Sequence, residues 1–138
     1  MTDNNINHLC PELLTIYREW LMRCTAAGLA VKAIVTWRSS VDQDAAKAKG
    51  LSNAAAGESP HNCCDEEGTP ASKAFDFAVF DANGDYVTNG ADDRYTQAAE
   101  IGKDLGLVWG GDFRKFKDFD HLELANWKES ARCSALQK

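Results

Sequence analysis

Three residues of the chain have the types that bind a catalytic metal ion, and a fourth has the type and spacing of its general base. His61 lies in a polar stretch, Asp76 lies in the apolar segment 73–80, and His121 follows Asp118 by three positions. Two histidines and one aspartate match the three protein ligands of a catalytic zinc site, which keeps one position for water. A carboxylate such as Asp118 beside that water could take its proton. The pattern therefore predicts hydrolysis at a zinc ion.

Asp76 is the strongest single indication of a ligand. Asp76 and small residues alternate with Phe75, Phe77 and Val79 in segment 73–80, which is the pattern of a strand with two different faces. A charged carboxylate buried in so apolar a strand is costly without a partner. A metal ion would be such a partner, and an arginine or a backbone amide is the alternative.

The segments that must position these residues predict a small α+β domain. Apolar residues at spacings of three and four predict a helix over 11–27, and acidic residues before an apolar pattern predict another over 92–105. Strands are predicted at 31–37, 73–80, 86–88, 107–109 and 122–124, with a long loop over 51–72. We expect one domain over 1–138, with a mainly antiparallel sheet flanked by helices and the zinc site at one end of the sheet. Residues 1–10 are predicted to be loose, and 125–138 to be a tail or short helix.

Arg38 lies at the predicted junction between the strand 31–37 and a helix. Ser40 and Gln43 have the spacing of a capping box, which predicts that this helix begins at Ser40. Side chains at such junctions often contribute to functional sites. The alternative is a surface arginine paired with a nearby aspartate, and the spacing favours neither.

Composition limits the partners and the compartment. A net charge of −6 argues against binding to nucleic acid or anionic membranes. No run approaches the ~20 apolar residues that cross a bilayer, so no stable membrane insertion is expected. Segment 1–7 lacks the basic start and apolar run of a signal peptide, and an odd number of cysteines, five, fits a reduced compartment. We therefore expect a monomer that is cytoplasmic as synthesised.

Four motifs together resemble those of the D-alanyl-D-alanine carboxypeptidase and dipeptidase family of zinc peptidases. Within that family the chain is similar to phage endolysins that cut L-alanyl-D-glutamate bonds. The motifs lie within residues 31–124 and are Ser59-x-His61, Ala74-x-Asp76, Trp109-Gly-Gly-Asp112 and Asp118-x-x-His121.

The resemblance implies a role for each motif residue. The Zn²⁺ ligands would be His61, Asp76 and His121. Asp118 would be the general base, and Arg38 would stabilise the oxyanion. The residues expected to contact substrate are Ser59, Trp109 and Asp112.

The resemblance also implies an activity and a setting. The chain would be a phage-type endolysin, a zinc-dependent peptidoglycan peptidase that hydrolyses the L-alanyl-D-glutamate bond of the stem peptide with a zinc-activated water. It would reach the cell wall from the cytoplasm after a holin-like partner permeabilises the membrane.

One departure from the family pattern leaves the substrate preference open. Asp76 follows His61 by fifteen residues, a markedly longer separation than in relatives, and Ser72 stands where relatives have glycine. A longer loop adds little closure entropy, so the site can survive the insertion. The added residues include Cys63 and Cys64, and they could alter the rim of the cleft.

Three other functions remain open. The same chemistry would serve a D-alanyl-D-alanine carboxypeptidase or dipeptidase, which differs in whether the cleft is open at both ends. A non-catalytic cell-wall-binding module could share the fold, although Arg38 and Asp118 argue against it. His61 with Cys63 and Cys64 could instead form a structural or redox site, although adjacent cysteines rarely bind one ion together.

Overall fold

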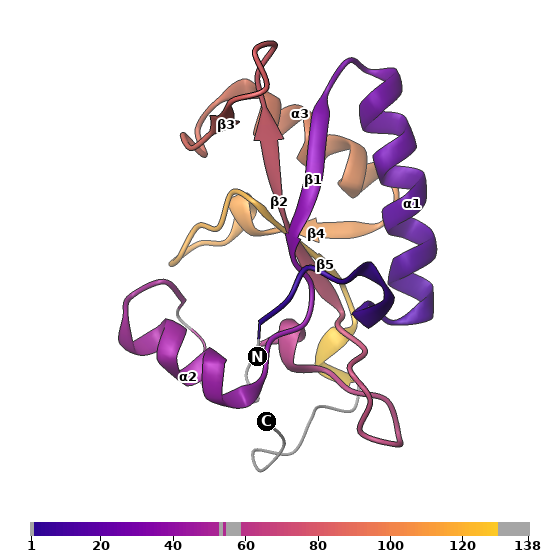
Figure 1. The fold of residues 1–138 in the computed structure, drawn as a ribbon, viewed down its shortest axis with the longest axis vertical. Helices are drawn as coiled ribbons and strands as arrows, with labels where there is room; N and C mark the ends of the chain where they lie inside the picture. The colour runs from indigo at the N-terminus through magenta and orange to yellow at the C-terminus, as the bar shows by residue number, and fades with distance from the viewer. Residues whose placement is uncertain (1, 53, 55–58, 130–138) are drawn as a thin grey trace.

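The computed structural model describes residues 2–52, 54 and 59–129, and its strands form one antiparallel sheet (Figure 1). The helices are α1 (Pro11–Ala26), α2 (Ser40–Ala48) and α3 (Asp93–Asp104). The strands are β1 (Ala30–Val35), β2 (Ala74–Phe80), β3 (Tyr86–Val87), β4 (Leu107–Trp109) and β5 (His121–Leu124). The strand order is β1-β2-β5-β4, and β3 pairs with β2. The predicted α+β domain with an antiparallel sheet and flanking helices is confirmed.

Helices α1 and α3 pack together on one face of the sheet and enclose the hydrophobic core. Phe75 and Phe77 of β2 point to this face, where both rings lie 5.1 Å from the buried ring of Trp20 in α1. The Trp20 indole also donates a hydrogen bond to the Ala98 carbonyl of α3 at 2.9 Å. Because side chains alternate along a strand, this packing turns Asp76 to the opposite face.

Helix α2 lies beside the sheet and outside the layer formed by α1 and α3 (Figure 1). Ser39 caps it, one residue before the predicted Ser40, because the Ser39 side chain accepts a hydrogen bond from the Asp42 N–H at 3.2 Å. Gln43 is buried and takes no part in a capping box. Its amide instead donates to the Ser52 hydroxyl at 2.8 Å, which ties the following loop to the helix.

The N-terminal segment is packed, so the prediction that residues 1–10 are loose is wrong for residues 2–10. The Asp3 N–H donates to the Trp37 carbonyl at 3.0 Å, and the Thr36 N–H donates to the Asp3 carbonyl at 2.7 Å. The Cys10 N–H donates to the Ser72 carbonyl at 2.9 Å. The segment therefore joins the end of β1 to the loop before β2.

The C-terminal segment begins with the short 3₁₀ helix η4 (Trp127–Glu129), where a tail or short helix was predicted. The rest of that prediction, residues 130–138, lies outside the described residues. None of the helices in the described part of the chain is long and apolar enough to cross a membrane.

Candidate active site

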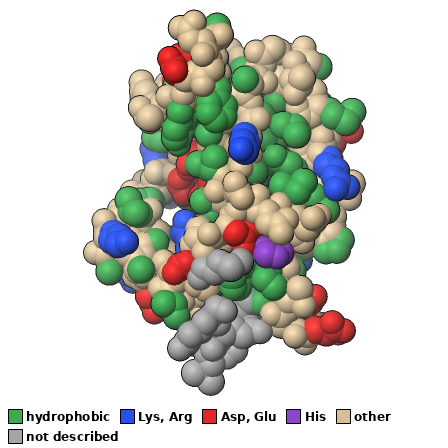
Figure 2. Space-filling view, in the orientation of Figure 1, with side chains coloured by type: hydrophobic (Ala, Val, Ile, Leu, Met, Phe, Trp, Pro, Cys, Tyr) green, Lys and Arg blue, Asp and Glu red, His purple; other side chains and the backbone are tan. Residues whose placement is uncertain are grey.

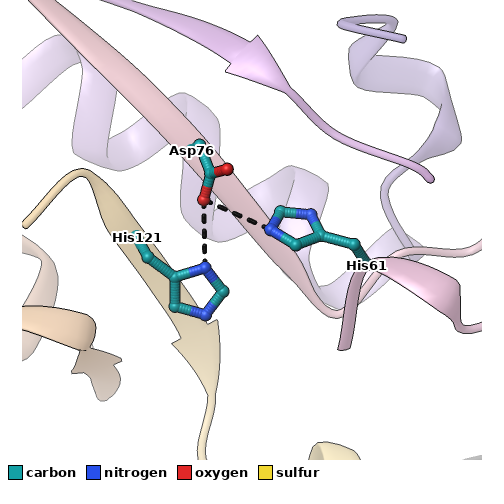
Figure 3. Close-up of side chains that lie close together, drawn as sticks. All are labelled: His61, Asp76 and His121. Carbon is teal, nitrogen blue, oxygen red and sulfur yellow. Dashed lines mark hydrogen bonds and ion pairs between the residues drawn. The ribbon is translucent and has the colours of Figure 1, made fainter. Parts of the chain in front are cut away.

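Asp76 and His121 are brought together by the register of the sheet. They lie directly opposite each other on the antiparallel strands β2 and β5, and both side chains point away from the helical layer. The Asp76 Oδ1 atom lies 3.0 Å from His121 Nδ1 and 3.2 Å from His61 Nε2 (Figure 3). The structure thus brings the three predicted ligands to one point.

His61 reaches this point from the short 3₁₀ helix η2 (Pro60–Asn62) in the long loop before β2. The Ser59 side chain accepts a hydrogen bond from the His61 N–H at 3.2 Å. The Arg38 N–H donates to the His61 carbonyl at 2.9 Å, and the Asn62 side-chain amide donates to the Arg38 carbonyl at 2.8 Å. The turn that carries His61 is therefore fixed to the chain just after β1.

The longer loop between His61 and Asp76 leaves the site intact. The Ala71 N–H donates to the Cys63 carbonyl and the Lys73 N–H donates to the Pro60 carbonyl, both at 3.0 Å. The two ends of the inserted loop are therefore held together beside η2. Of the described residues that line the main cleft, none belongs to segment 63–73. The sequence left open whether the inserted residues alter the rim of the cleft. In the described part of the chain they do not line the cleft.

The outer nitrogens of both histidines are hydrogen bonded in the way a metal site requires. His61 Nδ1 lies 2.8 Å from the Thr36 carbonyl oxygen, and His121 Nε2 lies 2.7 Å from Glu123 Oε1. Both partners are acceptors, so these nitrogens carry the protons, and His61 Nε2 and His121 Nδ1 can offer lone pairs to a metal.

The donor set fits zinc. The ligand atoms of His61, Asp76 and His121 all lie within 4.8 Å of one another. Donors at about 2.0–2.2 Å from a tetrahedral zinc ion are separated by about 3.3–3.6 Å. The observed separations of 3.0 and 3.2 Å from Asp76 are close to this requirement.

Burial and mutual pairing shift the pKa values of Asp76 and His121. Burial alone would raise the pKa of Asp76, but the charges and hydrogen bonds of His61 and His121 outweigh it and lower that pKa well below its ordinary value. Burial alone would lower the pKa of His121, but hydrogen bonds to Asp76 and Glu123 raise it to about 10. At neutral pH a metal ion must therefore displace a proton from His121 to bind there.

Asp118 lies where the sequence predicted the general base. Its Oδ2 atom lies 3.8 Å from His121 Nδ1, and its side chain is partly exposed in the cleft. The Asp118 N–H donates to the Gly110 carbonyl at 3.0 Å. A Cβ atom at Gly110 would collide with the Asp118 carbonyl, so the segment can approach this closely only because residue 110 is glycine.

The Trp109-Gly-Gly-Asp112 motif packs against the segment that carries Asp118. The Trp109 indole is buried and donates to the Phe119 carbonyl at 2.9 Å, which holds the segment that carries Asp118. Asp112 is exposed and pairs with Lys103 at 2.9 Å. Neither Trp109 nor Asp112 lines the cleft, so their predicted contact with substrate is not supported by the structure.

Asp120 lines the cleft, although the sequence analysis left it out of the site. Strand alternation would turn Asp120 away from His121, but β5 begins at His121, so the rule does not apply to the turn before it. Burial, the negative charge of Asp76 and a hydrogen bond with Asp118 raise the pKa of Asp120 to about 9. Asp120 is therefore protonated at neutral pH when no metal ion is bound, and can donate a hydrogen bond to Asp118.

Arg38 and Ser59 line the same cleft, which has a volume of about 580 Å³. The Arg38 Nη1 atom donates to Gln43 Oε1 at 3.2 Å. The arginine is therefore oriented by the buried glutamine of α2, and its guanidinium faces the site. Figure 2 shows acidic and basic side chains close together in the recess between helix α2 and the sheet.

A cysteine metal site receives no support. The two groups of described residues that could hold a metal are His61 with Asp76 and His121, and Asp76 with Asp118 and Asp120. Neither group contains a cysteine. Cys64 is disulfide-bonded, whereas Cys10 and Cys24 are free and buried.

Glu123 is a positioning residue that the sequence analysis did not identify. It lies two residues after His121 on β5, so strand alternation places both on one face, and this spacing was the signal that could have found it.

We expect Glu123→Gln to weaken zinc binding by about 10- to 100-fold, because it removes the charge that holds the His121 tautomer. Competition with a chromophoric chelator would measure this. Glu66→Gln, an exposed substitution in the inserted loop, should leave zinc affinity unchanged, and equal affinities for all three proteins would contradict the role of Glu123.

The fold and the site together define a class of protein. A small α+β domain with a His, Asp, His donor set and a nearby carboxylate is of the kind found in metal-dependent hydrolases.

Comparisons with known proteins agree with this class. The family model of D-alanyl-D-alanine carboxypeptidases matches residues 52–124, more than half of the chain. The peptidoglycan L-alanyl-D-glutamate endopeptidase CwlK of Bacillus subtilis is 32% identical over 120 residues, which cover 75% of this chain and 66% of that protein. The crystal structure of the L-Ala D-Glu endopeptidase ChiX of Serratia marcescens shares the fold, with a TM-score of 0.68 and 22% identity over 92% of this chain and 88% of that one. The chain therefore belongs to the D-alanyl-D-alanine carboxypeptidase family of peptidases.

Proposed function

We propose that the chain is a zinc-dependent peptidase that hydrolyses the L-alanyl-D-glutamate bond in the stem peptide of peptidoglycan. The observation that carries the proposal is the donor set of His61, Asp76 and His121, with Asp118 3.8 Å from the last of these. The names of CwlK and ChiX support the choice of bond, since both are endopeptidases for that linkage.

Zinc held by these three residues would polarise the scissile carbonyl and lower the pKa of water to about 7. Asp118 accepts the proton of the attacking water and delivers it to the leaving amine of D-glutamate. Asp120 lines the cleft beside Asp118 and would help to orient that side chain. Arg38 places its positive charge on the cleft wall, where it stabilises the negative charge that develops on the carbonyl oxygen.

The proposal includes a cellular setting, which rests on the resemblance to phage endolysins. The chain would act as a monomer on the cell wall, after a holin-like partner permeabilises the membrane. The acidic net charge of −6 fits an enzyme that binds the stem peptide in its cleft without a basic surface for the envelope.

A D-alanyl-D-alanine carboxypeptidase is the second candidate, because the matched family model carries that description. The chemistry at the zinc ion is the same for both activities. A carboxypeptidase acts only next to a free C-terminal carboxylate, whereas an endopeptidase needs room for substrate on both sides of the scissile bond.

Digestion of purified Gram-negative peptidoglycan tests the proposal. We expect mass spectrometry to find new fragments that begin at D-glutamate, which disappear with a zinc chelator and return when zinc is added. Loss of terminal D-alanine alone would transfer the assignment to the carboxypeptidase. No product from a folded, zinc-loaded protein would reject both activities and favour a wall-binding module.

A further inference from the structure

A second hollow adjoins the main cleft at the two cleft aspartates. It has a volume of about 340 Å³ and extends toward β3. The two hollows share Leu51, Phe116, Asp118 and Asp120. The two hollows therefore border each other at the catalytic carboxylates.

Exposed apolar side chains gather in this second hollow. Five large hydrophobic side chains are exposed in the described part of the chain, and three of them line it: Leu51, Tyr86 and Phe116. Tyr86 is 49% exposed and Phe116 is 40% exposed. In Figure 2, hydrophobic side chains gather on this face over the β2–β3 region. A cluster of exposed apolar groups beside a catalytic site is typical of a ligand-binding surface.

The Tyr86 ring is held in place from behind. The Phe80 ring of β2 packs against it with a centroid distance of 6.0 Å. The Tyr95 hydroxyl donates to the Val87 carbonyl at 2.7 Å and fixes strand β3 to the body of the domain. A rigid aromatic side chain with an exposed face provides a flat surface for a ligand at little cost in side-chain entropy.

The charges of the two hollows differ and indicate which part of the substrate each one binds. Besides the acidic residues of the site, the main cleft is lined by Arg38, Lys115 and Lys128, and these basic side chains suit the carboxylates of the stem peptide from D-glutamate onward. In the second hollow, the Lys117 amine donates to the carbonyls of Gly111 and Phe113 at 3.1 and 3.3 Å. The second hollow therefore combines aromatic and apolar groups with Asp118, Asp120 and a lysine whose ammonium is already hydrogen bonded to two carbonyls, so its opposite charges lie together and its apolar part suits a neutral group.

We propose that the second hollow binds the muramyl sugar that carries the stem peptide. This inference rests on the proposed function. In peptidoglycan the L-alanine nitrogen is joined through a lactyl group to that sugar, so a single residue separates the sugar substituent from the cleaved bond. One residue spans at most about 3.6 Å and the lactyl group adds a similar length, so the sugar must bind near the catalytic group. The second hollow meets this requirement because Asp118 and Asp120 belong to both hollows.

Two substrates with the same stem peptide test the inference: the free tetrapeptide and the same tetrapeptide on its N-acetylglucosaminyl-N-acetylmuramyl disaccharide. We expect Tyr86→Ala, at an aromatic residue that lines the second hollow and not the main cleft, to lower kcat/KM for the sugar-linked substrate by about tenfold, because it removes an aromatic contact with the sugar. The value for the free tetrapeptide should stay within about twofold, because its path through the main cleft is unchanged. Tyr86→Phe should keep the wild-type values, since it keeps the ring.

Met22→Ala is the matched control, because Met22 is an exposed apolar side chain on α1 that lines neither hollow. Melting curves would establish that each variant is folded. Unchanged values for the sugar-linked substrate, or equal losses on both substrates, would overturn the sugar site. If wild-type protein cleaves neither substrate, the proposed function itself fails and this inference fails with it.

Discussion

Asp118→Asn should lower kcat for stem-peptide cleavage by about 100- to 10,000-fold, because the variant cannot accept the proton of the attacking water. The side chain keeps its size, and the Asp118 N–H still donates to the Gly110 carbonyl. Zinc affinity should remain within about threefold of wild type, because Asp118 is not among the three predicted ligands. Steady-state kinetics on the free tetrapeptide and competition with a chromophoric chelator would measure the two quantities.

Two further variants make this result specific to Asp118. Asp112→Asn changes an exposed carboxylate of the same type outside the cleft, where it pairs with Lys103, and should leave kcat unchanged. Asp120→Asn changes the other cleft aspartate and should have a smaller effect, since an asparagine can still donate a hydrogen bond to Asp118. If Asp120→Asn abolished activity and Asp118→Asn did not, the roles of the two aspartates would have to be exchanged.

Asp76→Asn should weaken zinc binding by more than about 100-fold and abolish hydrolysis, because loss of a direct ligand should exceed the 10- to 100-fold cost of losing an outer partner. The carboxylate is the only anion among the three donors, and one of its oxygens faces both histidine nitrogens. Isothermal titration with zinc would show the loss of binding, and excess zinc should not restore activity.

Asp85→Asn, in the exposed turn before β3, is the matched control and should bind zinc as tightly as wild type. His61→Ala should match the effect of Asp76→Asn if both residues bind the same ion. A protein that loses zinc with His61→Ala but keeps it with Asp76→Asn would reject the His, Asp, His site and revive a site at the cysteines.

Strand alternation and residue type were enough to predict much of the site from the sequence. The apolar side chains at Phe75 and Phe77 required a buried face, so Asp76 between them had to point to the other face. The same alternation holds in β5, where Leu122 and Leu124 are buried in the core. Secondary structure followed equally well, because helix periodicity and turn residues act over a few neighbouring positions.

Contacts between distant parts of the chain decided the rest. The register that places Asp76 opposite His121, and the backbone bonds that hold His61 beside Arg38, join residues that no local pattern relates. Asp120 entered the cleft because the strand began one residue after it, a boundary that local propensity does not determine. The N-terminal residues gave no local signal of order, and their hydrogen bonds to the end of β1 and to Ser72 became visible only in the structure.

The sequence by itself therefore determined which residues could do the chemistry, because that depends on side-chain type and on spacing along one strand. The tertiary structure decided which residues do each task. It assigned Trp109 and Gly110 to support Asp118, placed Glu123 behind His121, and brought two hollows together at Asp118 and Asp120. Each of these depends on the packing of segments far apart in the chain, which is set by the free energy of the whole fold.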